Sequence, residues 1–238
     1  TDGYATQYPQ DMQQGDVAQL RPVDVVYVIL APSQSGIAAY QQTYVDSIEP
    51  IVEALKGHPV QRIIIVSSTR VYGENAGERI DDESMIQPID EQGHLLRKME
   101  LLWQAYYPQQ SIIVRPTGIY GTSIARLKKL AEQILSYPTL HFSNRIHIDD
   151  LAKFLALLAT LDKVQSSYIV TNNTPLAMHE ILRWFQQFLN LPEVELASEQ
   201  VTGKQIYATR LVETGFKFDH LICFNDYAAL LSAHSNGK

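Results

Sequence analysis

The sequence has little that could cross-link a fold or hold it in a membrane. Cys223 is the single cysteine among 238 residues, so no internal disulfide and no cysteine-rich metal cluster can form. The longest apolar run, Val25 to Ala31, is far shorter than the roughly 20 residues that a membrane-spanning helix needs. No secretory leader is recognisable. These absences predict a cytoplasmic protein without a membrane partner.

Positive charge is scarce as well. Lysine and arginine number 19 against 26 aspartates and glutamates, which gives a formal charge of −7. This balance argues against nucleic acid as a partner, although a local basic pocket for a phosphate group remains open. Hydrophobic residues make up 45% of the chain and charged residues 19%, which is typical of a folded globular protein.

Strand and helix patterns alternate along the chain, which predicts an α/β fold with a doubly wound, Rossmann-like parallel sheet. Apolar, β-rich segments predict buried strands at 25–31, 62–67, 111–115 and 168–171. Helical spacing predicts a helix at 37–56, which Pro50 should kink or split, and helices at 93–106, 149–161 and 176–189. Residues 73–91 are expected to form a polar loop. We expect residues 1–172 to form the core and residues 173–238 a small C-terminal substrate lobe.

Two predicted strands end in similar polar sequences. Ser67-Ser68-Thr69-Arg70-Val71-Tyr72-Gly73 follows one strand, and Arg115-Pro116-Thr117-Gly118-Ile119-Tyr120-Gly121 ends another. Doubly wound folds bind ligands at the carboxyl ends of parallel strands, so the two ends are expected to line one cleft with Ala31. Each end alone is also ordinary turn chemistry, because Ser, Thr and Gly are common after strands.

Further blocks make the pattern more specific. Asp82-Glu83-Ser84 with Pro88 lies between the two strand ends, and Arg145-Ile146-His147-Ile148-Asp149-Asp150-Leu151-Ala152 follows the second. In order and spacing, over about residues 20 to 230, these blocks resemble the extended and atypical short-chain dehydrogenase/reductases. Within them the chain is most similar to the NAD-dependent epimerase/dehydratase proteins. The resemblance implies NAD or NADP as cofactor, a small-molecule substrate that is often a nucleotide sugar, and a possible homodimer.

The resemblance also implies roles for individual residues. Ser68 would be the catalytic-type hydroxyl that hydrogen-bonds a substrate oxygen. The residues that would contact the cofactor are Ala31, Pro32, Ser67, Arg115, Pro116, Thr117 and Gly118. The residues that would contact the substrate are Thr69, Arg70, Arg145 and His147.

The chain departs from the family pattern at the phosphate-binding turn. The family holds the pyrophosphate on a glycine-rich turn at a helix N-terminus, where amide groups and the helix dipole favour anions. No G-x-G-x-x-G or G-x-x-G-x-x-G occurs in these 238 residues. The fold is therefore expected to lack the first strand–helix–strand unit. We expect the natural gene to encode about 40–60 residues before Thr1 that supply it.

A second departure concerns the catalytic pair of the family, Tyr-x-x-x-Lys. The lysine lowers the pKa of the tyrosine from about 10, so that the phenol can move a proton. Aligned on Gly93 and Glu100, the tyrosine position holds Gln92 and the lysine position holds Leu96. None of the 13 tyrosines has a lysine four residues later.

Other polar groups have two interpretations each. His94 is a solvated histidine of a first helical turn or a replacement proton carrier. Arg126, followed by Lys128 and Lys129, belongs to a solvated helix face or contacts a diphosphate. His147 and Asp149 are two potential metal ligands without a third, so the sequence predicts no metal site. Asp149 and Asp150 are expected to cap a helix instead.

Two functions are compatible with these residues. The first is an NAD(P)-linked epimerase, dehydratase or reductase acting on a sugar-like alcohol, in which another group or water replaces the tyrosine. The second is a non-catalytic relative that binds a dinucleotide or another ligand for sensing or assembly. The missing Tyr/Lys pair favours the second function. The intact strand-end sequences favour a retained ligand-binding pocket under either function.

Overall fold

A computed structural model describes residues 22–235 of the chain. Its central sheet has the strand order β1-β2-β4-β9, and every neighbouring pair is parallel. These strands are β1 (Val25–Val28), β2 (Arg62–Val66), β4 (Ser111–Pro116) and β9 (Ser167–Val170). The α/β, Rossmann-like class predicted from the alternating pattern is confirmed, and all four predicted strands exist.

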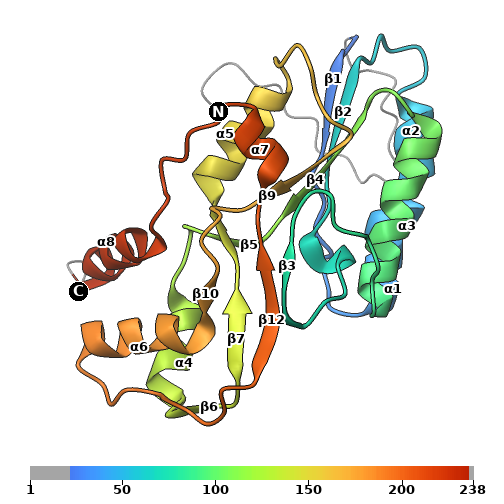
Figure 1. The fold of residues 1–238 in the computed structure, drawn as a ribbon. Helices are drawn as coiled ribbons and strands as arrows, with labels where there is room; N and C mark the ends of the chain where they lie inside the picture. Colours follow the sequence, from blue (N-terminus) through green and yellow to red (C-terminus); the bar gives the residue numbers. More distant parts are fainter. Residues whose placement is uncertain (1–21, 236–238) are drawn as a thin grey trace.

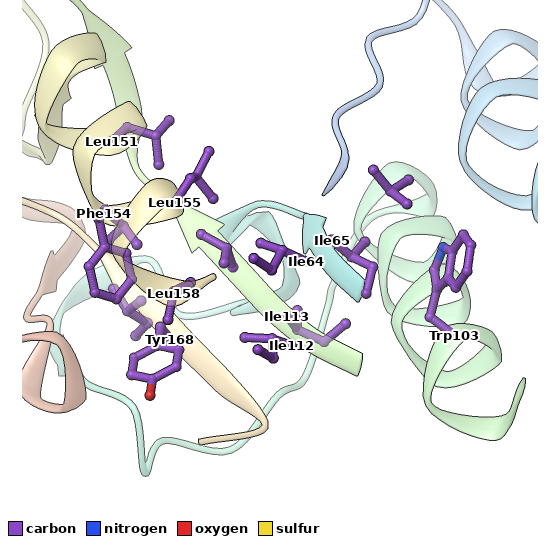
Figure 2. Packing of buried hydrophobic residues seen from close by; sticks show 14 of the residues in the cluster. Ile64, Ile65, Trp103, Ile112, Ile113, Leu151, Phe154, Leu155, Leu158 and Tyr168 are labelled. Atoms are coloured by element: carbon purple, nitrogen blue, oxygen red, sulfur yellow. The ribbon is translucent and has the colours of Figure 1, made fainter. Parts of the chain in front are cut away.

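The two inner strands are apolar because helices cover both faces of the sheet. Ile63, Ile64 and Ile65 of β2 are fully buried, and every residue of β4 is buried. The helix α3 (Glu91–Tyr106) places Trp103 against one face, and α5 (Ile148–Leu158) places Phe154 and its neighbours against the other (Figure 2). Burial on both faces explains why these strands read as unbroken apolar runs.

The helix predicted over residues 37–56 is interrupted, but before Pro50 rather than at it. Three segments cover this region: α1 (Ile37–Tyr40), the π-helical η2 (Gln41–Asp46) and α2 (Ile48–Ala54). Pro50 is the third residue of α2, where its missing N–H would have no helical partner in any case. The wide turn of η2 therefore provides the irregularity, and the proline lies in a position that tolerates it.

A second group of elements lies beside the carboxyl edge of the central sheet (Figure 1). Its four-stranded sheet has the order β10-β7-β12-β3, and two short pairs, β11-β6 and β5-β8, accompany it. These strands are β3 (Ala76–Ile80), β5 (Gly118–Tyr120), β6 (Ser136–Tyr137), β7 (Leu140–Ser143), β8 (Arg145–His147), β10 (Leu176–Ala177), β11 (Glu195–Leu196) and β12 (Val201–Ile206). The remaining helices are α4 (Ala125–Gln133), α6 (Met178–Leu189), α7 (Thr209–Glu213), α8 (Cys223–Ser235) and the 3-10 turn η3 (Thr69–Val71).

The prediction that residues 73–91 form a loop is wrong in part, because the segment contains β3. This strand is mostly exposed and pairs with β12, more than 120 residues away in the sequence. Its residues Ala-Gly-Glu-Arg-Ile carry little local β signal, so the partner strand stabilises the extended form. No sequence pattern near residue 76 could indicate that partner.

The hydrophobic core has two parts. The larger cluster surrounds the central sheet, and the smaller one includes Tyr120 and Ile124 as well as Phe185 and Tyr227. The smaller cluster thus draws on residues from both sides of position 172, and the division of the chain at 172/173 stays a prediction. Among residues 22–235, no helix is long and apolar enough to cross a membrane.

Candidate functional site

The predicted strand ends lie on one edge of the central sheet. Because β1, β2 and β4 are adjacent and parallel, Ala31, Ser68 and Thr117 all follow strands that end on the same side. The hydroxyl of Thr69 donates to the Pro116 carbonyl oxygen at 3.5 Å, which joins two of these ends directly. The sheet therefore brings together the segments that the sequence pattern assigns to one cleft.

Ser68 is half-buried at the start of η3. Its Oγ accepts a hydrogen bond from the Arg70 amide at 3.2 Å, so the hydroxyl caps this short turn. The hydroxyl proton is not used in that contact and can still donate to a ligand. The capped turn orients the hydroxyl that the resemblance assigns to a substrate oxygen, and this role stays a prediction.

A buried ionic network lies directly behind the strand ends. The carboxylate of Glu100, from α3, accepts hydrogen bonds from both Arg115 Nε and Nη2 at 2.9 Å. The same carboxylate accepts from Ser67 Oγ at 2.7 Å and from Arg97 at 3.0 Å. Glu100 is fully buried and Arg115 is 3% exposed. Helix α3 is therefore fastened to the ends of both inner strands.

The same network determines the protonation of its members. Burial acts to lower the pKa of Arg115, but hydrogen bonds to Glu100 and its negative charge outweigh burial and raise the pKa. Arg115 also donates to the Tyr72 hydroxyl at 3.0 Å. Burial raises the pKa of Tyr72 more than the nearby guanidinium lowers it, so this phenol is a packed, hydrogen-bonded group and not a base.

The side chains of Ser67 and Arg115 thus point to a protein carboxylate. The cofactor role that the resemblance gives them stays a prediction, and the structure shows them as parts of the scaffold. Pro116 and Thr117 are also buried, and the Thr117 hydroxyl donates to the Val170 carbonyl at 3.4 Å. Ala31 and Gly118 are exposed and Pro32 is half-exposed, so these three are the predicted cofactor residues that a ligand can reach.

Arg70 and Asp90 form an exposed pair next to the same loop. The Arg70 Nε lies 3.0 Å and 3.1 Å from the two Asp90 oxygens. Asp90 also caps α3 by accepting from the Gly93 amide at 2.7 Å. The hydrogen bond from Arg70 has the largest effect on the pKa of Asp90 and lowers it; burial acts to raise the pKa, and the Gly93 amide and the charge of Arg70 lower it further. Arg70 is therefore already paired with Asp90, whereas the resemblance assigns Arg70 to the substrate.

Gln92 and Leu96, in the first turns of α3, cannot perform the proton transfer that the family assigns to its Tyr/Lys pair. Leu96 is 2% exposed and packs in the main core, whereas Gln92 is half-buried. His94 is exposed on the same turn, which agrees with its interpretation as a solvated histidine. No phenol and ammonium pair therefore stands at these positions of α3.

A cavity of about 520 Å³ opens beside the end of β4. It lies between β5, β7 and α4, and Gly118 joins it to the strand-end residues. Its apolar wall is formed by Ile119, Leu127, Leu130, Ile134 and Met178, and its polar wall by Ser123, Arg126, Tyr137, His141, Ser143 and Arg145. Such a mixture of apolar surface and a few polar groups is usual for small-molecule sites.

Two arginines in the wall of this cavity have no acidic partner in the part of the chain that the structure describes. Within residues 22–235, neither Arg126 nor Arg145 forms an ion pair. Arg145 Nη2 contacts the sulfur of Met178 at 3.6 Å, and its Nε is buried without a hydrogen-bond partner. A half-buried guanidinium without an anion is unfavourable, so the cavity is suited to a negatively charged ligand. Arg126 and Lys128 do lie on a helix, α4, as the sequence indicates.

The predicted capping of α5 by Asp149 and Asp150 is wrong. The N-cap is His147, whose Nδ1 accepts from the Asp149 amide at 3.2 Å, and both aspartates lie in the first turn. Asp150 is fully buried and accepts from the amides of Asp219 and His220 at 2.8 and 3.0 Å. Its carboxylate therefore fixes the chain before α8, a long-range contact that the sequence pattern does not show.

His147 itself is 7% exposed and stacks on His220, so it lies behind the cavity wall and not in it. Tyr120, which lines the cavity, meets the His147 ring edge to face at 5.1 Å. The predicted contact of His147 with substrate stays a prediction.

Lys204 is a charged residue near the strand-end loop that no sequence motif singles out. Its Nζ donates to the Tyr72 carbonyl oxygen, directly after η3. Burial lowers the pKa of Lys204, although Glu74 and other carboxylates act against this. Lys204 lies 132 residues from Tyr72 in the sequence, and only the pairing of β12 with β3 brings them together.

The strand-end residues can be compared with what a nicotinamide dinucleotide needs. Gly118 and Ala31 are exposed at the carboxyl edge of the sheet, where doubly wound folds bind ligands, and the hydroxyl of Ser68 is oriented by its capped turn. For the pyrophosphate, no helix among residues 22–235 begins with a glycine-rich turn. Residues 22–235 therefore offer exposed positions at the strand ends but no glycine-rich turn for the phosphates, and the cofactor contacts stay a prediction.

Comparison with known proteins agrees with this architecture. A solved NAD-dependent epimerase/dehydratase from Methylobacillus flagellatus is 30% identical, with a TM-score of 0.72, and the match covers 83% of this chain and 73% of that one. The curated Escherichia coli K12 protein YeeZ is 24% identical over 209 residues, which is 86% of this chain and 74% of YeeZ. The UDP-glucuronic acid 4-epimerase of Bacillus cereus, solved with NAD, has a TM-score of 0.75 at 16% identity, covering 91% and 76%. No family model matches the chain.

The fold and the strand-end site define an extended short-chain dehydrogenase/reductase. Within that class, the chain belongs to the NAD-dependent epimerase/dehydratase family. The resemblance inferred from the sequence is thereby confirmed.

Proposed function

We propose that this protein binds a nucleotide sugar, with the nucleoside diphosphate in the cavity beside Arg145 and the sugar directed toward Ser68. The observation that carries the proposal is the half-buried Arg145, which has no acidic partner among the described residues. A diphosphate would supply the missing negative charge and accept hydrogen bonds from the guanidinium. Arg126 lies in the same wall and would provide a second cation.

The remaining cavity residues suit the other parts of such a ligand. Leu127, Leu130 and Met178 offer an apolar surface for a base, and Tyr137 lies near them in the lining. Gly118 lies both in the cavity wall and at the end of β4, so a ligand that extends past it reaches the edge where Ser68 lies. The Bacillus cereus neighbour acts on a UDP sugar and was solved with NAD, which supports the same ligand classes here.

The chemistry of the family would be NAD(P)-linked epimerisation, dehydration or reduction of a sugar alcohol. A bound nicotinamide dinucleotide would exchange a hydride with the sugar, with Gly118 near its nicotinamide end and with Ala31 and Pro32 near its ribose or pyrophosphate. In this chain, Ser68 would hold the reacting oxygen, and the Glu100–Arg115 network would fix the loop that carries Ser68. Gln92 and Leu96 offer no proton-accepting group, so water or another group at the strand edge would take the proton that the sugar hydroxyl loses as the hydride leaves.

Isothermal titration with UDP-glucose tests the binding proposal. We expect one site per chain, and Arg145→Met should weaken binding at least tenfold because a charge-assisted contact is lost. Lys98→Gln, which removes an exposed cation from α3 far from the cavity wall, is the control and should bind as the wild type does. Absence of binding, or equal binding by Arg145→Met, would refute the proposal.

Product analysis after incubation with UDP-glucose and NAD separates the enzyme from a non-catalytic binding protein. Formation of an epimerised, dehydrated or oxidised sugar nucleotide would support an enzyme. Binding of both ligands without any such product would support a sensing or assembly role. We expect no appreciable hydride transfer by the 238-residue chain, because it lacks both the Tyr/Lys pair and a glycine-rich turn.

A further inference from the structure

Three potential metal ligands come together where α5 begins and the chain approaches α8. His147 Nδ1 lies 3.7 Å from Asp149 Oδ2, and His220 Nε2 lies 3.9 Å from the same oxygen. All three ligand atoms lie within 4.8 Å of one another. The sequence offered only the pair His147 and Asp149, and the fold adds His220 from a distant part of the chain.

The free nitrogen of each histidine is defined by what the other nitrogen contacts. His220 Nδ1 lies 2.8 Å from Asp226 Oδ1, so a proton on Nδ1 would leave the Nε2 lone pair for an ion. The Nε2 of His147 faces the chain at Gly121, where an added Cβ would overlap it. The Nδ1 of His147 therefore faces Asp149, and it accepts the Asp149 amide proton at 3.2 Å.

A second layer of contacts holds these ligands. The Asp226 carboxylate, which contacts His220, also accepts a hydrogen bond from the Tyr120 hydroxyl at 2.8 Å. Carboxylates that receive the outer N–H of a metal-bound histidine are a common feature of metal sites, because they fix the ring and raise its basicity. Within residues 22–235, neither Asp149 nor Asp226 is paired with a lysine or arginine, so the negative charge is available to a cation.

We propose that His147, Asp149 and His220 bind a divalent transition-metal ion of the zinc class, with Asp226 as a positioning residue. Two imidazoles and one carboxylate are a donor set that Zn²⁺ accepts, and water would complete a tetrahedral sphere. The side chains of Asp149 and His220 are 75% and 27% exposed, so an ion can enter from solvent.

Binding requires a defined rearrangement. The two rings are stacked, with centroids 3.5 Å apart and planes 11° apart. A metal ion lies near the plane of each imidazole that it binds, so the rings must turn until their planes meet at the ion. The His147 Nδ1 must also release the Asp149 amide, which can bond to water at the exposed start of α5. The exposed Asp149 and the half-buried ring of His220 can make most of this movement.

The ion would join the two hydrophobic clusters of the protein. His147 and Asp149 belong to the β8–α5 junction of the main core, whereas His220 precedes α8, which packs in the smaller cluster. The expected effect is a metal-dependent clasp that holds α8 in place. Because the site is defined without reference to any substrate, it does not depend on the proposed function.

Zinc titration of the EDTA-treated, full 238-residue chain tests this site. Calorimetry should show one Zn²⁺ per chain, and Co²⁺ should give the visible absorption of a four-coordinate site. Asp226→Asn should weaken Zn²⁺ binding about 10- to 100-fold, and His220→Gln or Asp149→Asn should weaken it further. His94→Gln, which removes an exposed histidine of α3, is the matched control and should leave the affinity unchanged.

Circular dichroism and a urea midpoint for each variant show whether it is folded, so that loss of binding is not misread as loss of structure. A Zn²⁺-dependent rise in melting temperature that His220→Gln abolishes would support the clasp. No binding by the folded wild type, or equal affinity in wild type and folded His220→Gln, would overturn the proposal.

Discussion

Glu100 and Arg115 form a two-point ion pair in which each bond measures 2.9 Å, at the junction of α3 and β4. Both side chains are almost completely inaccessible to solvent. Burying both charges costs desolvation free energy. Removing one partner is far more destabilising, because the other charge then stays buried without a counter-ion. It holds the loops that carry Ser68 and Gly118 to one rigid scaffold.

Removal of one member of this pair should destabilise the fold strongly. We expect Glu100→Ala to lower the free energy of unfolding by about 3–5 kcal/mol, because Arg115 would remain buried without an anion. The double variant Glu100→Leu with Arg115→Met should recover much of that loss. Urea denaturation measures both, with Lys98→Gln on the exposed face of α3 as control. A single variant as stable as the wild type would contradict the role of the pair.

Asp90 should give the protein a component of stability that acid removes. Its pKa is lowered in the folded state by Arg70, so the charged carboxylate favours folding above the unfolded value of about 3.9. That contribution is lost as the pH falls through the lowered folded pKa. Because the pair is exposed and screened, Asp90→Asn should cost only about 0.5 kcal/mol at pH 7.

The measurement for Asp90 is urea unfolding between pH 7 and pH 3. The difference between the wild type and Asp90→Asn should be constant above about pH 5 and should shrink below about pH 4. Asparagine keeps the helix cap, so the variant isolates the charge. A difference that grows in acid would show that the charged carboxylate opposes folding.

Gly121 and Gly36 form a natural pair for separating backbone strain from side-chain contact. Their φ angles are +115° and +118°, but a Cβ on Gly121 would meet the His147 ring, whereas a Cβ on Gly36 would meet nothing within 4 Å. Alanine should cost about 1–3 kcal/mol at either position through backbone strain. Thermal or urea unfolding should show at least about 1 kcal/mol more loss for Gly121→Ala than for Gly36→Ala. Equal losses would show that the ring moves aside freely.

Restoring the Tyr/Lys pair of the family on α3 should destabilise the protein. Leu96 is part of the main core, so Leu96→Lys would bury an ammonium group and cost about 2–4 kcal/mol. Gln92 is half-buried, and Gln92→Tyr should cost less than about 1 kcal/mol. Melting temperatures of the two single variants test this order. If Leu96→Lys proved as stable as Gln92→Tyr, the helix would have room for a lysine after all.

The central fold was predictable because its signals are local. Strands β2 and β4 are apolar on both faces, and the spacing of buried residues in α3 and α6 repeats with the helical period, so each segment indicates its own structure. The strand-end site followed from parallel topology together with the family resemblance. The prediction failed where a distant partner decides the outcome, as for β3, which depends on β12.

The same distinction between local sequence signals and distant partners holds for the candidate site. Ser68, Arg145 and Gly118 were singled out from their sequence blocks, and their roles stay predictions. Lys204 was missed because nothing local distinguishes it, and the cap of α5 was misassigned because Asp150 has its partners 69 and 70 residues away. The third ligand of the proposed metal site was missed for the same reason, since His220 reaches His147 only through tertiary packing.

A crystal structure of the protein grown with UDP tests the proposed nucleotide-sugar site most directly. We expect the diphosphate within hydrogen-bond distance of Arg145 and Arg126, and the base against Leu127, Leu130 or Met178. The open end of the diphosphate, where a sugar would be attached, should point past Gly118 toward Ser68. Nucleotide bound elsewhere on the protein, or a cavity that stays empty at saturating UDP, would contradict the proposed function.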